Sequence, residues 1–182
     1  VFAGANPGKR PEYLEQGRLL GEALARRGAT LVYGGSKVGV MGAVAAGASA
    51  SGGSSLGVLT TQLANYELKF DGLDRLELVG SMAERKAMMS QQGDAIVALP
   101  GGTGTLDELF QEWTSQQLGL HSKPIGLLGS EFWQPLLDMV DHMVRNGFVR
   151  QTDRDHLVVA NDPDELLDRL ERWVPPVPRW TD

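Results

Sequence analysis

The sequence predicts an α/β protein with a doubly wound parallel sheet, helices on both faces and a single domain. Short apolar runs alternate with segments of helical period along the chain. The run at residues 95–99 is continuously apolar, which is typical of a strand buried on both faces. We find no internal repeat and no linker-like stretch in the middle. Such alternation favours parallel strands joined by crossover helices.

The elements follow in order from turn residues and apolar periodicity. Strands are expected at residues 1–3, 30–33, 56–60, 76–79, 95–99, 125–128 and 157–160. Helices are expected at residues 11–27, 38–51, 81–92, 105–118 and 133–146, with a last helix from residue 163. Residues 61–74 are expected to form an irregular polar loop.

Several helix ends carry local signals. Gly28 is placed to end the first helix. Ser81 and Glu84 have the spacing of a capping box, and Asp162 precedes Pro163 at a first helical position. With 182 residues the chain predicts one domain, assigned to residues 1–173. The proline-containing tail, residues 174–182, is expected to be irregular.

Composition excludes several classes of function. The chain has no cysteine, which rules out disulfides and Cys-based metal sites and agrees with a cytoplasmic protein. None of the three histidines has the spacing of a metal-ligand pair, so we expect no metal and no cofactor. The net charge of −6 disfavours nucleic-acid binding. No apolar run reaches about 18 residues, so no membrane span is expected.

Glycine is unusually frequent, at 23 of 182 residues. Three glycine-containing loops follow predicted strands, at residues 4–8, 34–39 and 100–105, and the last two lead directly into helices. Backbone N–H groups at a helix N-terminus bind anions, and Thr103 and Thr105 add hydroxyl donors. We therefore expect a phosphate site, with ligand-free tight turns as the alternative. Neither the P-loop pattern nor G-x-G-x-x-G after the first strand is present.

Two charged residues near these loops have both an ordinary and a functional interpretation. Glu108 could close a capping box with Thr105, in the first turn of its helix, or hold a carboxylate beside the phosphate loop. Arg85 shares a helix face with Met82 and Met89. Its side chain could extend to solvent along that face, or act in the site.

Three segments together resemble one known family. Residues 100–108 read P-G-G-T-G-T-L-D-E and match P-G-G-x-G-T-x-x-E, while residues 82–86 read M-A-E-R-K and match M-x-x-R-K. Residues 34–42 resemble the loop G-G-G-x-x-G-L-M-G, and residues 113–124 are also similar. Together they resemble the LOG ("Lonely Guy") family, the cytokinin riboside 5′-monophosphate phosphoribohydrolases.

The resemblance implies hydrolysis of the N-glycosidic bond of a nucleoside 5′-monophosphate, AMP or N6-substituted AMP, to free base and ribose 5-phosphate. It also implies a Rossmann-like fold and a homodimer, with Arg85 and Glu108 as the catalytic pair. The residues it assigns to substrate binding are Gly34, Gly35, Glu67, Met82, Lys86, Gly101, Gly102, Thr103, Gly104, Thr105, Asp107 and Thr114.

The chain departs from the family pattern at two places, and rival functions stay open. Ser36 replaces a glycine of the second loop, and Ala5-Asn6 stands where the family has Ser-Ser. A non-catalytic carrier of a phosphorylated ligand, such as a molybdenum-cofactor carrier, is the main alternative, although the intact Arg85 and Glu108 pair favours an enzyme. A pyridoxal-dependent lysine decarboxylase is disfavoured because no lysine sits in a recognisable Schiff-base motif.

Overall fold

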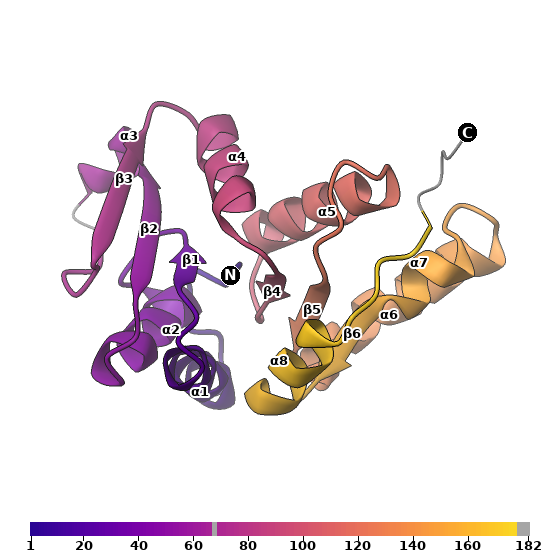
Figure 1. Cartoon of the computed structure of the whole chain (residues 1–182), viewed down its shortest axis with the longest axis horizontal. Coiled ribbons are helices and arrows are strands. Elements are labelled where there is room, and N and C mark those ends of the chain that lie inside the picture. The colour runs from indigo at the N-terminus through magenta and orange to yellow at the C-terminus, as the bar shows by residue number, and fades with distance from the viewer. Residues whose placement is uncertain (67–68, 178–182) are drawn as a thin grey trace.

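Six parallel strands form two three-stranded sheets in the computed structural model, which describes residues 1–66 and 69–177 (Figure 1). One sheet has the order β1-β2-β3 and the other β4-β5-β6. The strands are β1 (Leu31–Tyr33), β2 (Ser55–Thr60), β3 (Arg75–Val79), β4 (Ile96–Ala98), β5 (Ile125–Leu128) and β6 (Leu157–Ala160).

The first three residues of the chain lie between β1 and β4 and join the two sheets. Phe2 pairs in parallel with Ala98, and its N–H donates to the Val97 carbonyl at 2.8 Å. On the other side, the nitrogen of Val1 donates to the Val32 carbonyl at 2.6 Å. The chain therefore winds outward from this central segment in both directions. This arrangement is the predicted doubly wound sheet.

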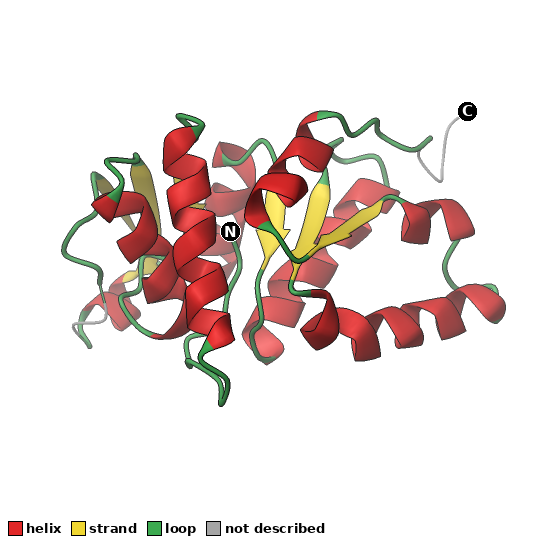
Figure 2. Ribbon diagram, turned by 90° about the horizontal axis from the view of Figure 1, so that it is seen from below, coloured by secondary structure: helices red, strands yellow, loops and turns green. Residues whose placement is uncertain are grey.

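Helices cover both faces of the strands (Figure 2). One buried cluster packs the strands against α1, α2 and α8, and a second packs them against α4, α5 and α6. The helices are α1 (Glu12–Arg26), α2 (Gly39–Ala50), α3 (Thr61–Ala64), α4 (Met82–Gln92), α5 (Thr103–Gln117), α6 (Ser130–Arg145), α7 (Gln151–Asp155) and α8 (Pro163–Glu171).

Some boundaries differ from the prediction because tertiary contacts set them. The short helices α3 and α7 lie where a loop and an unassigned segment were expected. Helix α6 begins at Ser130 instead of residue 133, because the Asn161 side chain accepts the Ser130 N–H at 2.8 Å. Helix α5 begins at Thr103, two residues before the expected start, with Gly102 as its N-cap. The predicted caps at Ser81 and Asp162 are both formed.

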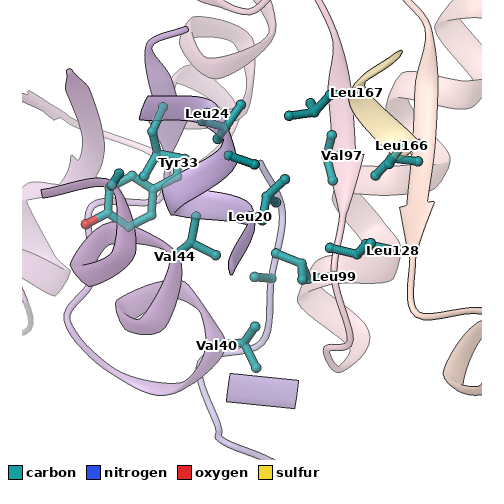
Figure 3. Close-up of a cluster of buried hydrophobic side chains, with 14 of the residues drawn as sticks. Leu20, Leu24, Tyr33, Val40, Val44, Val97, Leu99, Leu128, Leu166 and Leu167 are labelled. Atoms are coloured by element: carbon teal, nitrogen blue, oxygen red, sulfur yellow. The ribbon is translucent and has the colours of Figure 1, made fainter. Parts of the chain in front are cut away.

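Close packing of α1 on α2 uses several of the glycines. A Cβ atom at Gly21 would lie 2.1 Å from the Val44 carbonyl oxygen, and one at Gly47 would lie 2.1 Å from the Arg18 carbonyl oxygen. Around this contact, leucine and valine side chains from α1, α2, β4, β5 and α8 fill the space between helices and strands (Figure 3). Part of the glycine surplus therefore serves the close packing of α1 on α2.

None of the helices within residues 1–66 and 69–177 has the length and apolar character that a membrane crossing requires.

Candidate active site

A pocket of about 500 Å³ opens at the carboxyl ends of the central strands. Its walls include the loop after residues 1–3 and the loop after β4, which lie on either side of the point where the winding direction reverses. Ligands of open α/β sheets bind at this point. The lining residues are Ala3, Gly4, Ala5, Asn6, Pro7, Gly8, Tyr13, Val40, Met41, Met82, Arg85, Pro100, Gly101, Gly102, Thr103, Gly104, Thr105, Asp107, Glu108 and Phe132.

The glycines of the loop before α5 have different structural roles. At Gly101 a Cβ atom would lie 2.1 Å from Oγ1 of Thr105 and 2.9 Å from the nitrogen of Gly4, so the fold itself needs glycine there. At Gly102 and Gly104 a Cβ atom would meet nothing within 4 Å among the described residues. Neither of these two has a left-handed φ. They leave the backbone open to close approach by a ligand.

The N-terminus of α5 forms part of this pocket. Its N-cap, Gly102, offers no side-chain acceptor. The first N–H groups of a helix have no partner within the helix, and they carry the positive end of the helix dipole. Thr103 and Thr105 lie in the same wall. This end of α5 can therefore bind an anionic group.

Arg85 on α4 and Glu108 on α5 form a buried ion pair in the pocket. Nη1 of Arg85 donates to Oε1 of Glu108 at 3.0 Å, and Nε of Arg85 donates to the Val58 carbonyl at 2.9 Å. The two residues are 6% and 9% exposed. No described residue donates a hydrogen bond to Oε2 of Glu108, so this oxygen is available to a ligand in the pocket.

The environment of Glu108 acts on its ionisation in two opposing ways. Burial raises the pKa of the Glu108 carboxyl above its ordinary value, and the charge of Arg85 lowers it, with burial the larger effect. Burial disfavours the charged form because water is a better solvent for charge than the protein interior. Arg85 thus supports the carboxylate form at a position that otherwise favours the acid.

Both ordinary interpretations of these residues are wrong. Because α5 begins at Thr103, Glu108 lies in its second turn and cannot cap the helix with Thr105. The side chain of Arg85 is buried instead of extending to solvent. In each case a partner on another helix determines where the side chain points.

Lys86 and Asp107 form a second contact between α4 and α5, next to the first. Nζ of Lys86 donates to Oδ2 of Asp107 at 2.8 Å. Asp107 lines the pocket and its side chain is largely exposed, whereas that of Lys86 is mostly covered. If a ligand anion took the place of the Asp107 carboxylate as the partner of Lys86, the ammonium group of Lys86 would remain beside the N-terminus of α5.

The other predicted binding residues lie in different parts of the structure, and only some of them line the pocket. Met82 lines the pocket and is half-exposed. Thr114 lies instead in a shallow groove on the outer face of α5, which meets the pocket at Thr103 and Asp107. Gly34 and Gly35 do not line the pocket.

Gly34 and Gly35 lie behind the site. A Cβ atom at Gly34 would be 1.9 Å from Nη2 of Arg85, and Gly35 is in the left-handed region with φ +73°. Glu67 lies outside the described residues. Of the predicted binding residues, those of the loop before α5 thus converge with Met82, Asp107 and the Arg85–Glu108 pair.

Sequence reasoning missed the apolar side of the pocket. Tyr13 and Phe132 line it from α1 and α6, with their rings edge to face and 5.7 Å between centroids. Val40 and Met41 add aliphatic surface from α2. These residues come from distant parts of the chain and carry no shared local pattern, so only the fold brings them together.

A larger hollow of about 1020 Å³ opens at the opposite, amino-terminal edge of the strands. Residues that precede strands line it, such as Thr30, Ser54, Asp74 and Ala95. It holds neither the glycine loops nor a long-helix N-terminus, and parallel sheets bind ligands at the other edge. Throughout the described chain, no group of three or more His, Asp or Glu side chains is arranged to hold a metal ion.

Comparison with known proteins identifies the family. Residues 41–170 match the family model described as "Possible lysine decarboxylase". The cytokinin riboside 5′-monophosphate phosphoribohydrolase of Rhodococcoides fascians is 42% identical over 164 residues, which cover 89% of this chain and 83% of that protein. This chain belongs to the LOG family. A rice relative (Oryza sativa subsp. japonica), named a "Probable cytokinin riboside 5′-monophosphate phosphoribohydrolase", is 42% identical over 97% of this chain and 72% of its own length.

Solved structures match the LOG-family chain in fold. The molybdenum cofactor binding protein from Rippkaea orientalis has a TM-score of 0.71 at 22% identity, covering 93% of both chains. The molybdenum cofactor carrier protein from Chlamydomonas reinhardtii has a TM-score of 0.70 at 22% identity, covering 95% of this chain and 94% of that one. At this identity the likeness supports the α/β architecture and nothing about ligands.

Proposed function

We propose that this protein hydrolyses the N-glycosidic bond of AMP or N6-substituted AMP and releases the free base and ribose 5-phosphate. The observation that carries the proposal is the buried pair of Arg85 and Glu108 in a pocket edged by the N-terminus of α5. The names of the relatives, cytokinin riboside 5′-monophosphate phosphoribohydrolases, agree with it.

The 5′-phosphate is assigned to residues 101–105 and Lys86. Support comes from the uncapped N-terminus of α5 and from the open backbone at Gly102 and Gly104. A phosphate there would interact with backbone N–H groups and the helix dipole. The ammonium of Lys86 would add a charge-assisted hydrogen bond. Phosphate binding remote from the reacting bond holds the ribose in position for the chemical step.

Glu108 is assigned to the chemical step. Cleavage of a ribosyl C–N bond builds positive charge on the sugar, and a nearby carboxylate stabilises that charge. The bond between C1′ and the base nitrogen breaks, a water oxygen bonds to C1′, and the proton from water passes to the base. The free oxygen of Glu108, Oε2, is suited to orient that water.

Arg85 is assigned to hold the Glu108 carboxylate and to interact with the departing base. Its guanidinium stays protonated at neutral pH, so it acts through charge and hydrogen bonds instead of transferring a proton. Met82 and Asp107 line the same pocket and are assigned to substrate contact. Glu67 keeps only its assignment by resemblance, as do Gly34 and Gly35.

We infer further that the protein is a homodimer and that Thr114 acts near the junction of two copies. The groove on α5 that holds Thr114 adjoins the pocket, and Leu118 and Leu120 at the end of the helix are exposed. Light scattering should give a dimer mass. Gln111→Arg, an exposed change in the groove, should give a monomer. A wild-type protein that is monomeric at all concentrations would contradict the dimer.

Incubation with AMP, followed by chromatography of the products, tests the activity. We expect free adenine and ribose 5-phosphate in equal amounts. A parallel series with N6-substituted AMP, GMP and CMP defines the base. The alternative, a carrier of a phosphorylated ligand, predicts binding without release of any base. That outcome across the series would overturn the proposed hydrolysis.

A further inference from the structure

Gly34 directly follows β1, at the point where the chain passes behind Arg85 and Glu108. Its neighbour Gly35 has a left-handed φ of +73°, which accounts for glycine there. Gly34 itself has no left-handed φ. Backbone conformation therefore does not explain glycine at position 34, and another constraint must act.

That constraint is the guanidinium of Arg85. A Cβ atom at position 34 would lie 1.9 Å from Nη2 and 3.1 Å from Cζ of Arg85, and 3.1 Å from Sδ of Met41. The first distance is far below a van der Waals contact. A side chain at position 34, even a methyl group, must therefore displace the end of Arg85.

Arg85 has little freedom to give way without losing its partners. Nε of Arg85 donates a hydrogen bond to the Val58 carbonyl on β2, and Nη1 donates one to the Glu108 carboxylate on α5. The strand carbonyl is fixed by the sheet, and the Glu108 carboxylate is buried. A shift of the guanidinium away from position 34 therefore stretches or breaks one of these two hydrogen bonds.

We infer that Gly34 is a positioning residue, whose missing side chain leaves the space in which Arg85 holds Glu108. The second glycine loop then acts on the reaction through Arg85 instead of binding phosphate. This inference rests on the proposed function for its kinetic consequences. Its geometric content concerns only Gly34, Arg85 and Glu108.

Gly34→Ala is the direct test, and Gly93→Ala is the matched control. At Gly93 a Cβ atom would make ordinary contacts of 3.5 Å, and φ is −93°. Because the clashing atom is the end of a flexible side chain, we expect Gly34→Ala to fold. Its kcat on AMP should fall roughly 100-fold, the effect of misplacing a catalytic group by about 1 Å, with little change in KM. Gly93→Ala should keep wild-type kinetics.

A double-mutant cycle with Arg85→Lys separates this role from a general structural one. Lysine has no Nη2, so in the Arg85→Lys background Gly34→Ala should change kcat by less than about twofold. Equal effects of Gly34→Ala in both backgrounds would contradict the inference. If Gly34→Ala alone does not fold, the double variant should recover folding, and failure to recover would also overturn it.

A titration of Glu108 gives a result that does not depend on activity. In protein labelled with ¹³C-glutamate, the Glu108 signal is assigned by its loss in Glu108→Gln. Because Arg85 lowers the pKa of Glu108, Gly34→Ala should raise that pKa and Gly93→Ala should not. An unchanged Glu108 pKa in folded Gly34→Ala overturns the inference. A wild-type protein that releases no base overturns the proposed function instead, and the titration still decides the role of Gly34.

Discussion

Ser90 on α4 donates a hydrogen bond from its hydroxyl to Oε2 of Glu112 on α5, at 2.8 Å. Glu112 is one helical turn beyond Glu108 and is only 3% exposed. Nε2 of His121 lies 3.1 Å from the same oxygen, without the alignment of a hydrogen bond. The helices that carry Arg85 and Glu108 are therefore also joined by a third polar contact, in which the carboxylate is buried.

Removing the Glu112 carboxylate should destabilise the protein. Glu112→Ala leaves Ser90 and His121 without their buried partner, which costs about 1–3 kcal/mol of unfolding free energy. Urea unfolding followed by circular dichroism measures the loss. Glu112→Gln should lose less stability than Glu112→Ala, because its amide oxygen can still accept the Ser90 hydrogen bond and only the charge is lost. An unchanged urea midpoint for Glu112→Ala would show that the contact contributes nothing to the free energy of unfolding.

Glu112 should also make stability depend on acidity. Burial opposes its ionisation, but His121 and Ser90, with the charge of Lys123, outweigh burial and lower the pKa of Glu112. A lowered pKa means that the carboxylate contributes stability above the ordinary glutamate pKa of about 4.3, and that this stability is lost as pH falls through the folded-state value. The stability difference between wild type and Glu112→Gln should therefore shrink below pH 4. A difference independent of pH would contradict this.

Loss of either Arg85 or Glu108, the proposed catalytic pair, should remove activity while the fold is kept. Glu108→Gln keeps the size of the side chain and removes the charge, so release of adenine from AMP should fall at least about 100-fold. Arg85→Ala should have a comparable effect because the carboxylate loses its partner. Glu171→Gln, on the exposed surface of α8, is the control. Near-normal turnover by both site variants would rule out their assignment.

The pH profile of the reaction should reflect the burial of Glu108. Its charged side-chain neighbours are Arg85, which lowers the pKa, and Asp107, which raises it, and burial outweighs the effect of Arg85. The pKa is therefore above the ordinary value, and the acidic limb of kcat/KM should lie above about pH 4.3. Initial rates between pH 4 and 9 measure it. A limb at or below the ordinary glutamate value would mean that another group controls the rate.

Lys86 should affect binding more than the chemical step. Lys86→Ala removes the proposed charge-assisted hydrogen bond to the phosphate, and KM for AMP should therefore rise roughly 10- to 100-fold with a smaller change in kcat. Arg172→Ala, which removes a highly exposed cation at the end of α8, should leave KM unchanged. Equal effects of the two changes would indicate only a general effect of net charge.

The alternation of strands and helices could be predicted because it depends on local periodicity and turn residues. Caps such as Ser81 and Asp162 are equally local, and both form as expected. The start of α6 could not be predicted, because it depends on Asn161, about thirty residues further along the chain. Glu108 shows the same limit. Its spacing to Thr105 suggested a cap, and only the true start of α5 excludes that interpretation.

By itself, the sequence determined the fold class, the loop before α5 and the two charged residues of the candidate site. The fold class follows from the alternation of strands and helices, and the two charged residues were singled out by the resemblance of residues 82–86 and 100–108 to the LOG family. Only the tertiary structure decided that Arg85 and Glu108 contact each other, that Tyr13 and Phe132 face the same pocket, and that Gly34 makes room for a guanidinium. These relationships join side chains from different elements, and their distances are set by how the helices pack on the sheet.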